Sequence, residues 1–447
     1  MSFLPTKLLT LIESINQKFI ALFEKKSNSS NKSIVFFLFL FTATISAPML
    51  IGYQLDNDPT RDENKDIGIF RDRAQTILDG ELLYRDTEKV TVTPPLINYL
   101  FTPALILGDS LLVWMAWFAF FLFLTSAVLF FILEAYFDRR LAIAGSMIYS
   151  ASPFGQFTSV AMLQDDSIIV FFLALSFLFL TRKRWYLAAT AFGLGTMTKL
   201  FPALCAPLAF AAPDKWKTRV GVVTIGLSIG LAISLPFLIL AYGDFIQFLE
   251  FYLFGVQPTS DNQGFASLSQ IEQRGMSYWR FFGEAILFVP SKLLHAIFVL
   301  ALLSTWYGAF TKRLEINAAF TLCILWIFVF YSKIHYGYHM MALLVLIPYA
   351  IHDSRKLWSL IGISFFGQIV HKAWRGGLFT ENDWVHLFLA SILWFYWIYW
   401  ARFVIKNQEY RQLEDNASIQ QSLIACSWIV IVCFGYTFLL GMDKILF

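Results

Sequence analysis

One lysine, Lys199, lies in an apolar stretch between two basic clusters. The stretch runs from Trp185 to Ala212, and the clusters are Arg182 to Arg184 and Lys215 to Arg219. A transmembrane helix needs about 20 apolar residues, and basic loops stay on the cytoplasmic side. Because these 28 residues are too few for two full crossings, we expect a re-entrant pair of short helices that turns back at Thr198 to Pro202.

The composition is typical of an all-α, polytopic membrane protein. Of the 447 residues, 57% are hydrophobic and 15% are charged, and apolar runs recur along nearly the whole chain. The net charge of +3 does not indicate a nucleic-acid partner, because the basic residues mark loops between apolar runs instead of forming one face. The four cysteines lie inside apolar segments without metal-ligand spacing, which predicts a packing role.

We expect about 11 spans besides the re-entrant pair. With a cytoplasmic N-terminus, this order puts all the basic clusters between spans on the cytoplasmic side, whereas a full crossing at Lys199 would reverse every later cluster. The expected spans are Ser33–Tyr53, Leu111–Phe137, Leu141–Met162, Ser167–Thr181, Arg219–Tyr242, Ser291–Phe310, Asn317–Tyr331, Met340–Ile351, Leu357–Ala373, Val385–Ile405 and Ser418–Leu440.

The pattern divides the chain into three parts. Residues 1–32 carry apolar side chains at helical spacing among lysines, which predicts an amphipathic helix on the cytoplasmic membrane surface. Residues 33–353 form the main transmembrane module, and residues 354–447 add the C-terminal transmembrane helices. The multi-pass pattern predicts a protein of the cell membrane.

The loop from Gln54 to Pro95 is expected outside the membrane and is acidic, with ten carboxylates and six basic residues. Apolar residues from Ile67 to Leu78 recur at intervals of three and four, which predicts an amphipathic helix that ends at Asp79-Gly80. This outer helix should lie on the membrane interface.

Asp66 immediately precedes the outer helix. Its carboxylate suits an N-cap, and it also suits a general base aimed at an acceptor hydroxyl; both roles are compatible. Asp56, Asp58 and Asp62 are rival candidates for the base, or else belong to a solvated acidic loop.

Gln164, Asp165 and Asp166 form a second outer polar segment, directly before an apolar run. They are candidate substrate-binding residues, and the aspartates alternatively cap the helix from Ser167 onward. A paired carboxylate also suits a metal ion, but no third and fourth ligand follow nearby, so we predict no metal site.

A third outer segment runs from Lys333 to His339. Its Lys333, His335, Tyr338 and His339 are candidate contacts for a phosphate or a sugar. Two histidines four residues apart share a helix face, as metal ligands do, although an aromatic interfacial segment accounts for the pattern equally well.

The outer segment Gly243 to Pro290 contains Arg274, a further candidate phosphate ligand. The segment is polar and contains glycine from Gln257 to Gln273, and we expect it to be either a lid loop or a disordered connection.

Lys199 would lie beside the start of a second half-helix near Leu200, with Pro202 in its first turn. Free amide hydrogens and a lysine ammonium together suit an anion, above all a phosphate. The alternative is a structural ion pair between Lys199 and one of the outer aspartates.

Several segments resemble, in their order along residues 33 to 350, the GT-C fold glycosyltransferases. The likeness is closest to the prokaryotic polyprenyl-phosphate-mannose-dependent mannosyltransferases. The segments that carry it are Asp66–Phe70, Leu78–Asp86, Thr93–Leu100, Gln164–Asp166, Thr198–Pro202 and His335–Tyr338.

The resemblance implies a glycosyltransferase that moves a sugar, with mannose favoured, from a polyprenyl-phosphate donor to a hydroxyl on a lipid, glycan or protein. Transfer would take place at the extracytoplasmic face, with inversion at the anomeric carbon and without a cofactor. A first-loop aspartate acts as the base in such enzymes, and by position Asp66 takes this role. The family often has Tyr where this chain has Phe70, and the polar insertion before Asp66 keeps Asp56 and Asp58 in competition.

The alternative class is a secondary transporter or a lipid or oligosaccharide flippase, which also has broken helices. Transporters often have matching interrupted helices in both halves. This sequence has one clear interruption, at Lys199, and an acidic outer loop with its own helix, so we favour the enzyme.

Overall fold

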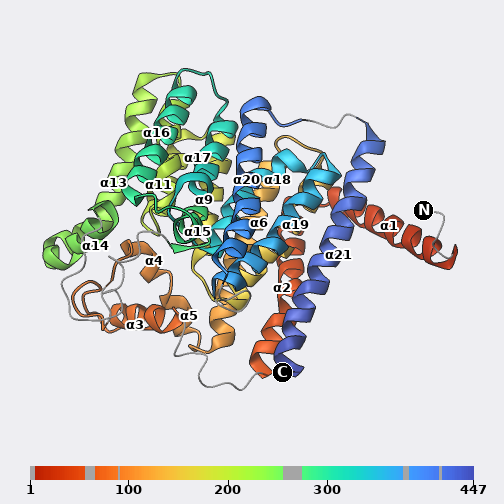
Figure 1. Cartoon of the computed structure of the whole chain (residues 1–447), viewed down its shortest axis with the longest axis horizontal. Helices are drawn as coiled ribbons and strands as arrows, with labels where there is room; N and C mark the ends of the chain where they lie inside the picture. The colour runs from red at the N-terminus through yellow and green to blue at the C-terminus, as the bar shows by residue number, and fades with distance from the viewer. Residues whose placement is uncertain are drawn as a thin grey trace.

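The computed structural model describes residues 6–55, 66–88, 91–254, 274–375, 382–411 and 415–446. The described chain is mostly helical, as predicted (Figure 1). One short parallel pairing joins β1 (Arg274–Gly275) to β2 (Lys333–Ile334).

Within the described residues, six helices are long and apolar enough to cross a membrane. They are α2 (Asn31–Leu55), α6 (Leu111–Leu133), α13 (Trp216–Leu240), α16 (Ser291–Phe310), α20 (Asp383–Lys406) and α21 (Asn416–Leu446). Between them lie α7 (Arg139–Ala151), α9 (Asp166–Thr181), α17 (Ile316–Phe330), α18 (His339–Ala350) and α19 (Ser354–Trp374). Helices therefore occupy the predicted apolar runs, while the number of crossings stays a prediction.

One expected span, Leu141–Met162, is not a continuous α-helix. α7 ends at Ala151, and the chain restarts as α8 (Pro153–Gln156) and the π-helical turn η2 (Phe157–Ala161). Proline has no amide hydrogen to continue the ladder, and the Ser152 hydroxyl accepts from the amide of Gly155 instead. This break shortens the helix that leads to Gln164.

The helix break predicted around Lys199 is present. α10 (Trp185–Thr196) ends before it, and α11 (Phe201–Cys205) and α12 (Pro207–Ala211) follow it. α10 and α13 lie side by side and run in the same direction. Near their starts, a side chain at Gly221 of α13 would meet Tyr186 of α10, and near their ends the Ser234 hydroxyl contacts the Met197 sulfur. The chain must therefore turn back between α10 and α13, which puts both flanking basic clusters at one end of the bundle.

A layer of short helices covers the opposite end of the bundle (Figure 1). It contains α3 (Ile67–Leu78), α4 (Pro95–Tyr99) and α5 (Thr102–Ile106). α3 ends as predicted: Gly80 has φ +76°, and the amide of Glu81 reaches back to the carbonyl of Thr76.

Aromatic rings hold the layer of short helices on the bundle. Phe70 of α3 stacks on Phe101, with ring centroids 4.3 Å apart, and its edge meets Phe118 of α6. The Arg71 guanidinium also binds the Asp109 carboxylate at 2.7 Å. Because Asp66 directly precedes α3, these contacts fix the position of its backbone.

The segment Gly243 to Pro290 contains more secondary structure than the lid loop or disordered connection that we expected. α14 (Tyr242–Phe254) and α15 (Tyr278–Ala285) occupy much of it. Phe245 and Phe248 of α14 pack against Tyr84 of the first loop. Residues Gln257 to Gln273 lie outside the described residues.

α1 (Thr6–Ser27) leaves the bundle beside α21 and lies across the axes of the long helices (Figure 1). The Trp428 indole donates to the Asn16 side chain at 3.0 Å, and Arg140 lies 3.8 Å from Glu24. The predicted amphipathic helix is therefore present and attached to the end of the bundle opposite α3.

The hairpin predicts how single cysteines at the helix ends will react. Lys183→Cys and Lys217→Cys should both be labelled by a membrane-impermeant maleimide from the cytoplasmic side, and Glu81→Cys from the opposite side only. All three positions are exposed, whereas the four native cysteines are buried. Labelling of residues 183 and 217 from opposite sides would show that the hairpin is wrong.

Candidate active site

Lys199 lies between two carboxylates at the turn of the hairpin. Its Nζ is 3.4 Å from Asp165 Oδ1 and 3.2 Å from Asp166 Oδ1. The exposed fractions of the three side chains are 17%, 12% and 6%. The structure therefore contains the ion pair that the sequence offered as the alternative to a phosphate site. The Lys199 side chain is still partly accessible to solvent.

The backbone before the aspartates has an unusual conformation that aims their side chains. Leu163 is fully buried and has φ +56°, a region that branched and bulky residues rarely adopt. The backbone amide of Gln164 then bonds to the carbonyl of Thr158, six residues earlier in the π-helical turn η2. Neither aspartate side chain caps α9, so the capping alternative is wrong in this structure.

Asp66 joins this cluster through Gln164. The side-chain nitrogen of Gln164, Nε2, donates to Asp66 Oδ2 at 3.0 Å and also to the carbonyl of Met162 at 3.3 Å. Asp66 occupies the N-cap position of α3, but its carboxylate accepts no capping hydrogen bond. The exposed Asp66 carboxylate is therefore aimed at the Gln164 turn and away from the amides of its own helix.

The predicted third segment reaches the same place through Tyr338 and Gly337. The Lys199 ammonium lies 5.3 Å from the centre of the Tyr338 ring, and the ring of His335 is 5.3 Å from that of Tyr338. A Cβ atom at Gly337 would fall 2.0 Å from Asp166 Oδ2. Only glycine lets this turn approach the Asp166 carboxylate so closely.

His335 and His339 do not share a helix face. His335 is extended, at φ −92° and ψ 156°, and is followed by the 3₁₀ turn η4 (Tyr336–Tyr338). His339 begins α18 and is 1% exposed, with its Nδ1 3.0 Å from the Tyr336 carbonyl and its ring stacked on Phe154. The structure thus brings His335 to the cluster and packs His339 in an aromatic core.

The remaining candidates fall into two groups. Lys333 and Arg274 are neighbours, because their backbones pair in β2 and β1. Asp56, Asp58 and Asp62 lie outside the described residues.

A polar network that was not predicted from the sequence lies beneath α3. Arg73 is 3% exposed and donates to the Thr93 hydroxyl at 3.1 Å, and Asn98 donates to the carbonyl of Pro94 at 3.1 Å. In the same loop, the Arg85 guanidinium and the amide of Leu82 lower the pKa of Asp86 by hydrogen bonding. The available signal in the sequence was the position of Arg73, three residues after Phe70 and beside Ala74 on the apolar side of the predicted helix.

The amide of Leu96 connects the polar network to the hairpin, since it bonds to the carbonyl of Met197 at 2.9 Å. The loop that holds Asp66 and the turn that holds Lys199 are therefore tied together by backbone as well as by side chains.

Comparison with known proteins identifies the family. A model of glycosyltransferase family 87 matches residues 92–332, more than half of the chain. The chain belongs to glycosyltransferase family 87. A search of curated proteins gave no match.

The crystal structure of ArnT from Cupriavidus metallidurans bound to undecaprenyl phosphate is similar in fold. The TM-score is 0.52 at 14% sequence identity, and the alignment covers 92% of this chain and 77% of that chain. The GT-C fold predicted from the sequence resemblance is thereby confirmed.

In this family 87 glycosyltransferase, the matched region includes the hairpin and the Gln164 turn. It holds Gln164, Asp165, Asp166 and Lys199, whereas Asp66 and the segment His335 to Tyr338 lie outside it. The family match therefore covers the ion pair, and the structure adds the residues that surround it.

The ion pair predicts a stability difference between two lysine variants. Lys199→Ala leaves two largely buried carboxylates without their cation, which should cost about 3–5 kcal/mol of unfolding free energy. Lys312→Ala is the control, because Lys312 forms an exposed pair with Asp214 at 3.4 Å and donates to the Ala212 carbonyl at 2.8 Å, contacts that together should contribute less than about 2 kcal/mol. Thermal unfolding of both purified variants measures the difference, and equal losses would contradict a buried ion pair.

Proposed function

We propose that this glycosyltransferase moves a sugar, with mannose favoured, from a polyprenyl-phosphate donor to a hydroxyl group of a lipid, glycan or protein. Transfer takes place at the extracytoplasmic face and inverts the anomeric carbon. The observation that carries the proposal is the cluster in which Asp66, Gln164, Asp165, Asp166 and Lys199 meet. The family supports glycosyl transfer over transport.

Asp66 is the general base in this proposal. Asp165 and Asp166 are largely buried and are both engaged by the Lys199 ammonium, so an acceptor hydroxyl has little access to their carboxylates. Asp66 is exposed and is held through one oxygen by a neutral amide, that of Gln164. An acceptor hydroxyl within hydrogen-bond reach of Asp66 would lose its proton to this carboxylate as it attacks the anomeric carbon.

Lys199 binds the donor phosphate in this proposal. A sugar phosphate ester already has a good leaving group, so the protein has to hold the charge that develops on the phosphate oxygens. The half-helix contributes less than we expected, because Pro207 divides it and α11 contains only five residues. The lysine ammonium is therefore the main phosphate contact.

The charge balance of the cluster predicts competition. Three carboxyl groups, those of Asp66, Asp165 and Asp166, surround the single ammonium of Lys199. A donor phosphate that binds the ammonium would come close to these carboxylates and be repelled by their negative charge. It must therefore draw the ammonium away from at least one of them. Lys333, His335 and Tyr338 lie in the segment next to Lys199, and we assign them, with Arg274, to the donor phosphate or sugar.

Competition for Lys199 predicts opposite effects of two variants on donor affinity. Lys199→Ala should raise the Kd for a polyprenyl-phosphate sugar at least about tenfold, since a charged hydrogen bond contributes about 1.5–3 kcal/mol. Asp165→Asn should leave the Kd unchanged or lower it, because the ammonium is then shared with one carboxylate. Lys199→Arg should retain part of the binding.

Donor affinity is measured by titration of purified protein with the radiolabelled lipid, below the unfolding temperature of every variant. If Lys199→Ala and Asp165→Asn lose affinity equally, the loss comes from disturbed folding of the ion pair. That result would show that Lys199 does not bind the donor phosphate.

If Asp66 is the general base, one variant should bind the donor without transferring its sugar. Asp66→Asn keeps the size of the side chain and an oxygen that can accept from Gln164, but it cannot accept a proton, so turnover should fall at least about a hundredfold with donor Kd unchanged. Asp79→Asn, at the other end of α3, is the control and should turn over normally. Asp56→Asn and Asp58→Asn decide the alternative assignments, and normal turnover of all three loop variants would rule out the mechanism.

A further inference from the structure

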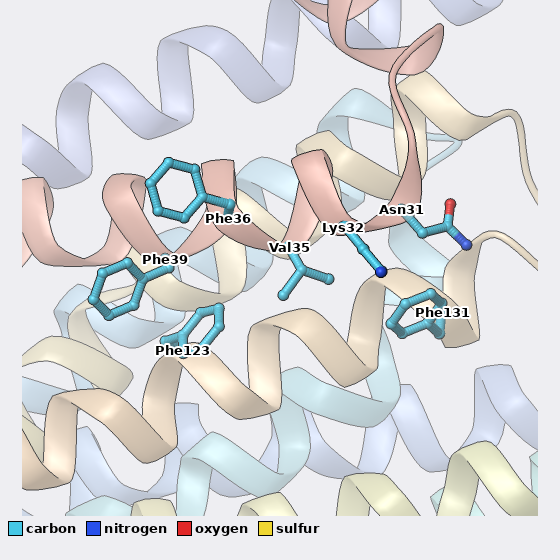
Figure 2. A pocket seen from close by; sticks show the side chains of 7 residues that line it. All are labelled: Asn31, Lys32, Val35, Phe36, Phe39, Phe123 and Phe131. Atoms are coloured by element: carbon cyan, nitrogen blue, oxygen red, sulfur yellow. The ribbon is translucent and has the colours of Figure 1, made fainter.

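A groove of about 440 Å³ opens between α2 and α6 on the outside of the helix bundle (Figure 2). Its walls are apolar over most of their length, and its residues are Asn31, Lys32, Val35, Phe36, Phe39, Phe123 and Phe131. Phe39 and Phe123 meet edge to face, with centroids 5.3 Å apart, and bring the two helices together at one end. The small side chain of Val35 leaves the space above this contact open.

The groove lies far from the Lys199 cluster. The carbonyl of Phe131, at the polar end of the groove, accepts from Arg182, which follows α9, while Asp166 begins α9. The 16 residues of α9 separate the two ends by roughly 24 Å. The groove is therefore not part of the proposed donor site.

Positive charge gathers at the polar end of the groove. Lys32 lines it, Arg139 donates to the side chain of Asn31, and Arg182 donates to Phe131. Glu134 lies 3.2 Å from Arg139, and Asp138 and Glu24 pair with Arg140 at 2.9 and 3.8 Å. Among the residues that the structure describes, no carboxylate forms an ion pair with Lys32. Lys32 is therefore the basic residue that lines the groove, and its ammonium complements a negatively charged head group.

The length of the groove suits the outer part of a lipid chain. From Asn31 to Phe39 the helix rises by roughly 12 Å, less than half of the ~30 Å hydrocarbon core. An acyl chain lying against Phe36 and Phe39 would therefore place its head group beside Lys32.

We propose that the groove between α2 and α6 is a binding site for one anionic glycerophospholipid, whose phosphate contacts Lys32 and Arg182 while an acyl chain fills the apolar part. The occupant comes from the membrane leaflet at the end of the bundle opposite Asp66. It seals the contact between α2 and α6 without entering the reaction.

The test is lipid competition on the purified full-length protein. The protein is incubated with equal concentrations of phosphatidylglycerol and phosphatidylcholine, and native mass spectrometry measures the ratio of the retained lipids. We expect the parent to prefer phosphatidylglycerol, and Lys32→Gln to lower the ratio about fivefold, which corresponds to the ~1 kcal/mol of one basic residue at a membrane surface.

Lys217→Gln is the matched control, since Lys217 is an exposed lysine at the same end of the bundle and away from the groove. It should keep the parent ratio, and Val35→Trp, which fills the groove, should lower it even if Lys32 is intact. A parent-like ratio in Lys32→Gln, or in folded Val35→Trp, would overturn the proposal. Displacement of phosphatidylglycerol by equimolar polyprenyl phosphate would overturn the assignment of a glycerophospholipid.

Discussion

The ion pair that Lys199 makes with Asp165 and Asp166 is the interaction on which the arrangement of the site depends. It joins the turn of the α10–α11 hairpin to the start of α9, two points more than 30 residues apart in the chain. Since all three side chains are largely buried, their desolvation is offset only while the charges stay together. The hairpin therefore has one favourable position against α9, and the same contact places an ammonium beside the first loop.

Neighbouring features are consistent with this constraint. Gly337 has no side chain, so the η4 turn can pack directly on Asp166 and bring Tyr338 over the ammonium. The positive φ of Leu163 turns Gln164 toward Asp66 and is a strain that the surrounding packing must support. Strain and buried charge both reduce stability, and both are found where we propose that chemistry takes place.

Much of the helical fold was predictable because hydrophobic runs and basic loops constrain a membrane protein strongly. The limits of α16 and the stop of α3 at Gly80 follow directly from apolar length and glycine chemistry. The break at Ser152 was missed because the apolar run around it is long enough for one span. Ser152 and Pro153 are the only sign of the break in that run. In the site, the order of polar segments along the chain indicated that they would meet, but hydropathy cannot tell which face a histidine occupies. His339 therefore appeared as a ligand, although tertiary packing buries its ring.

The most direct test of the account is an experimental structure of the protein with a polyprenyl-phosphate sugar bound. We predict the donor phosphate within about 3 Å of Lys199 Nζ, the usual length of a charged hydrogen bond, with the ammonium moved away from Asp165 or Asp166 and the anomeric carbon facing Asp66. A donor bound elsewhere, with Lys199 still in contact with both aspartates, would contradict the account.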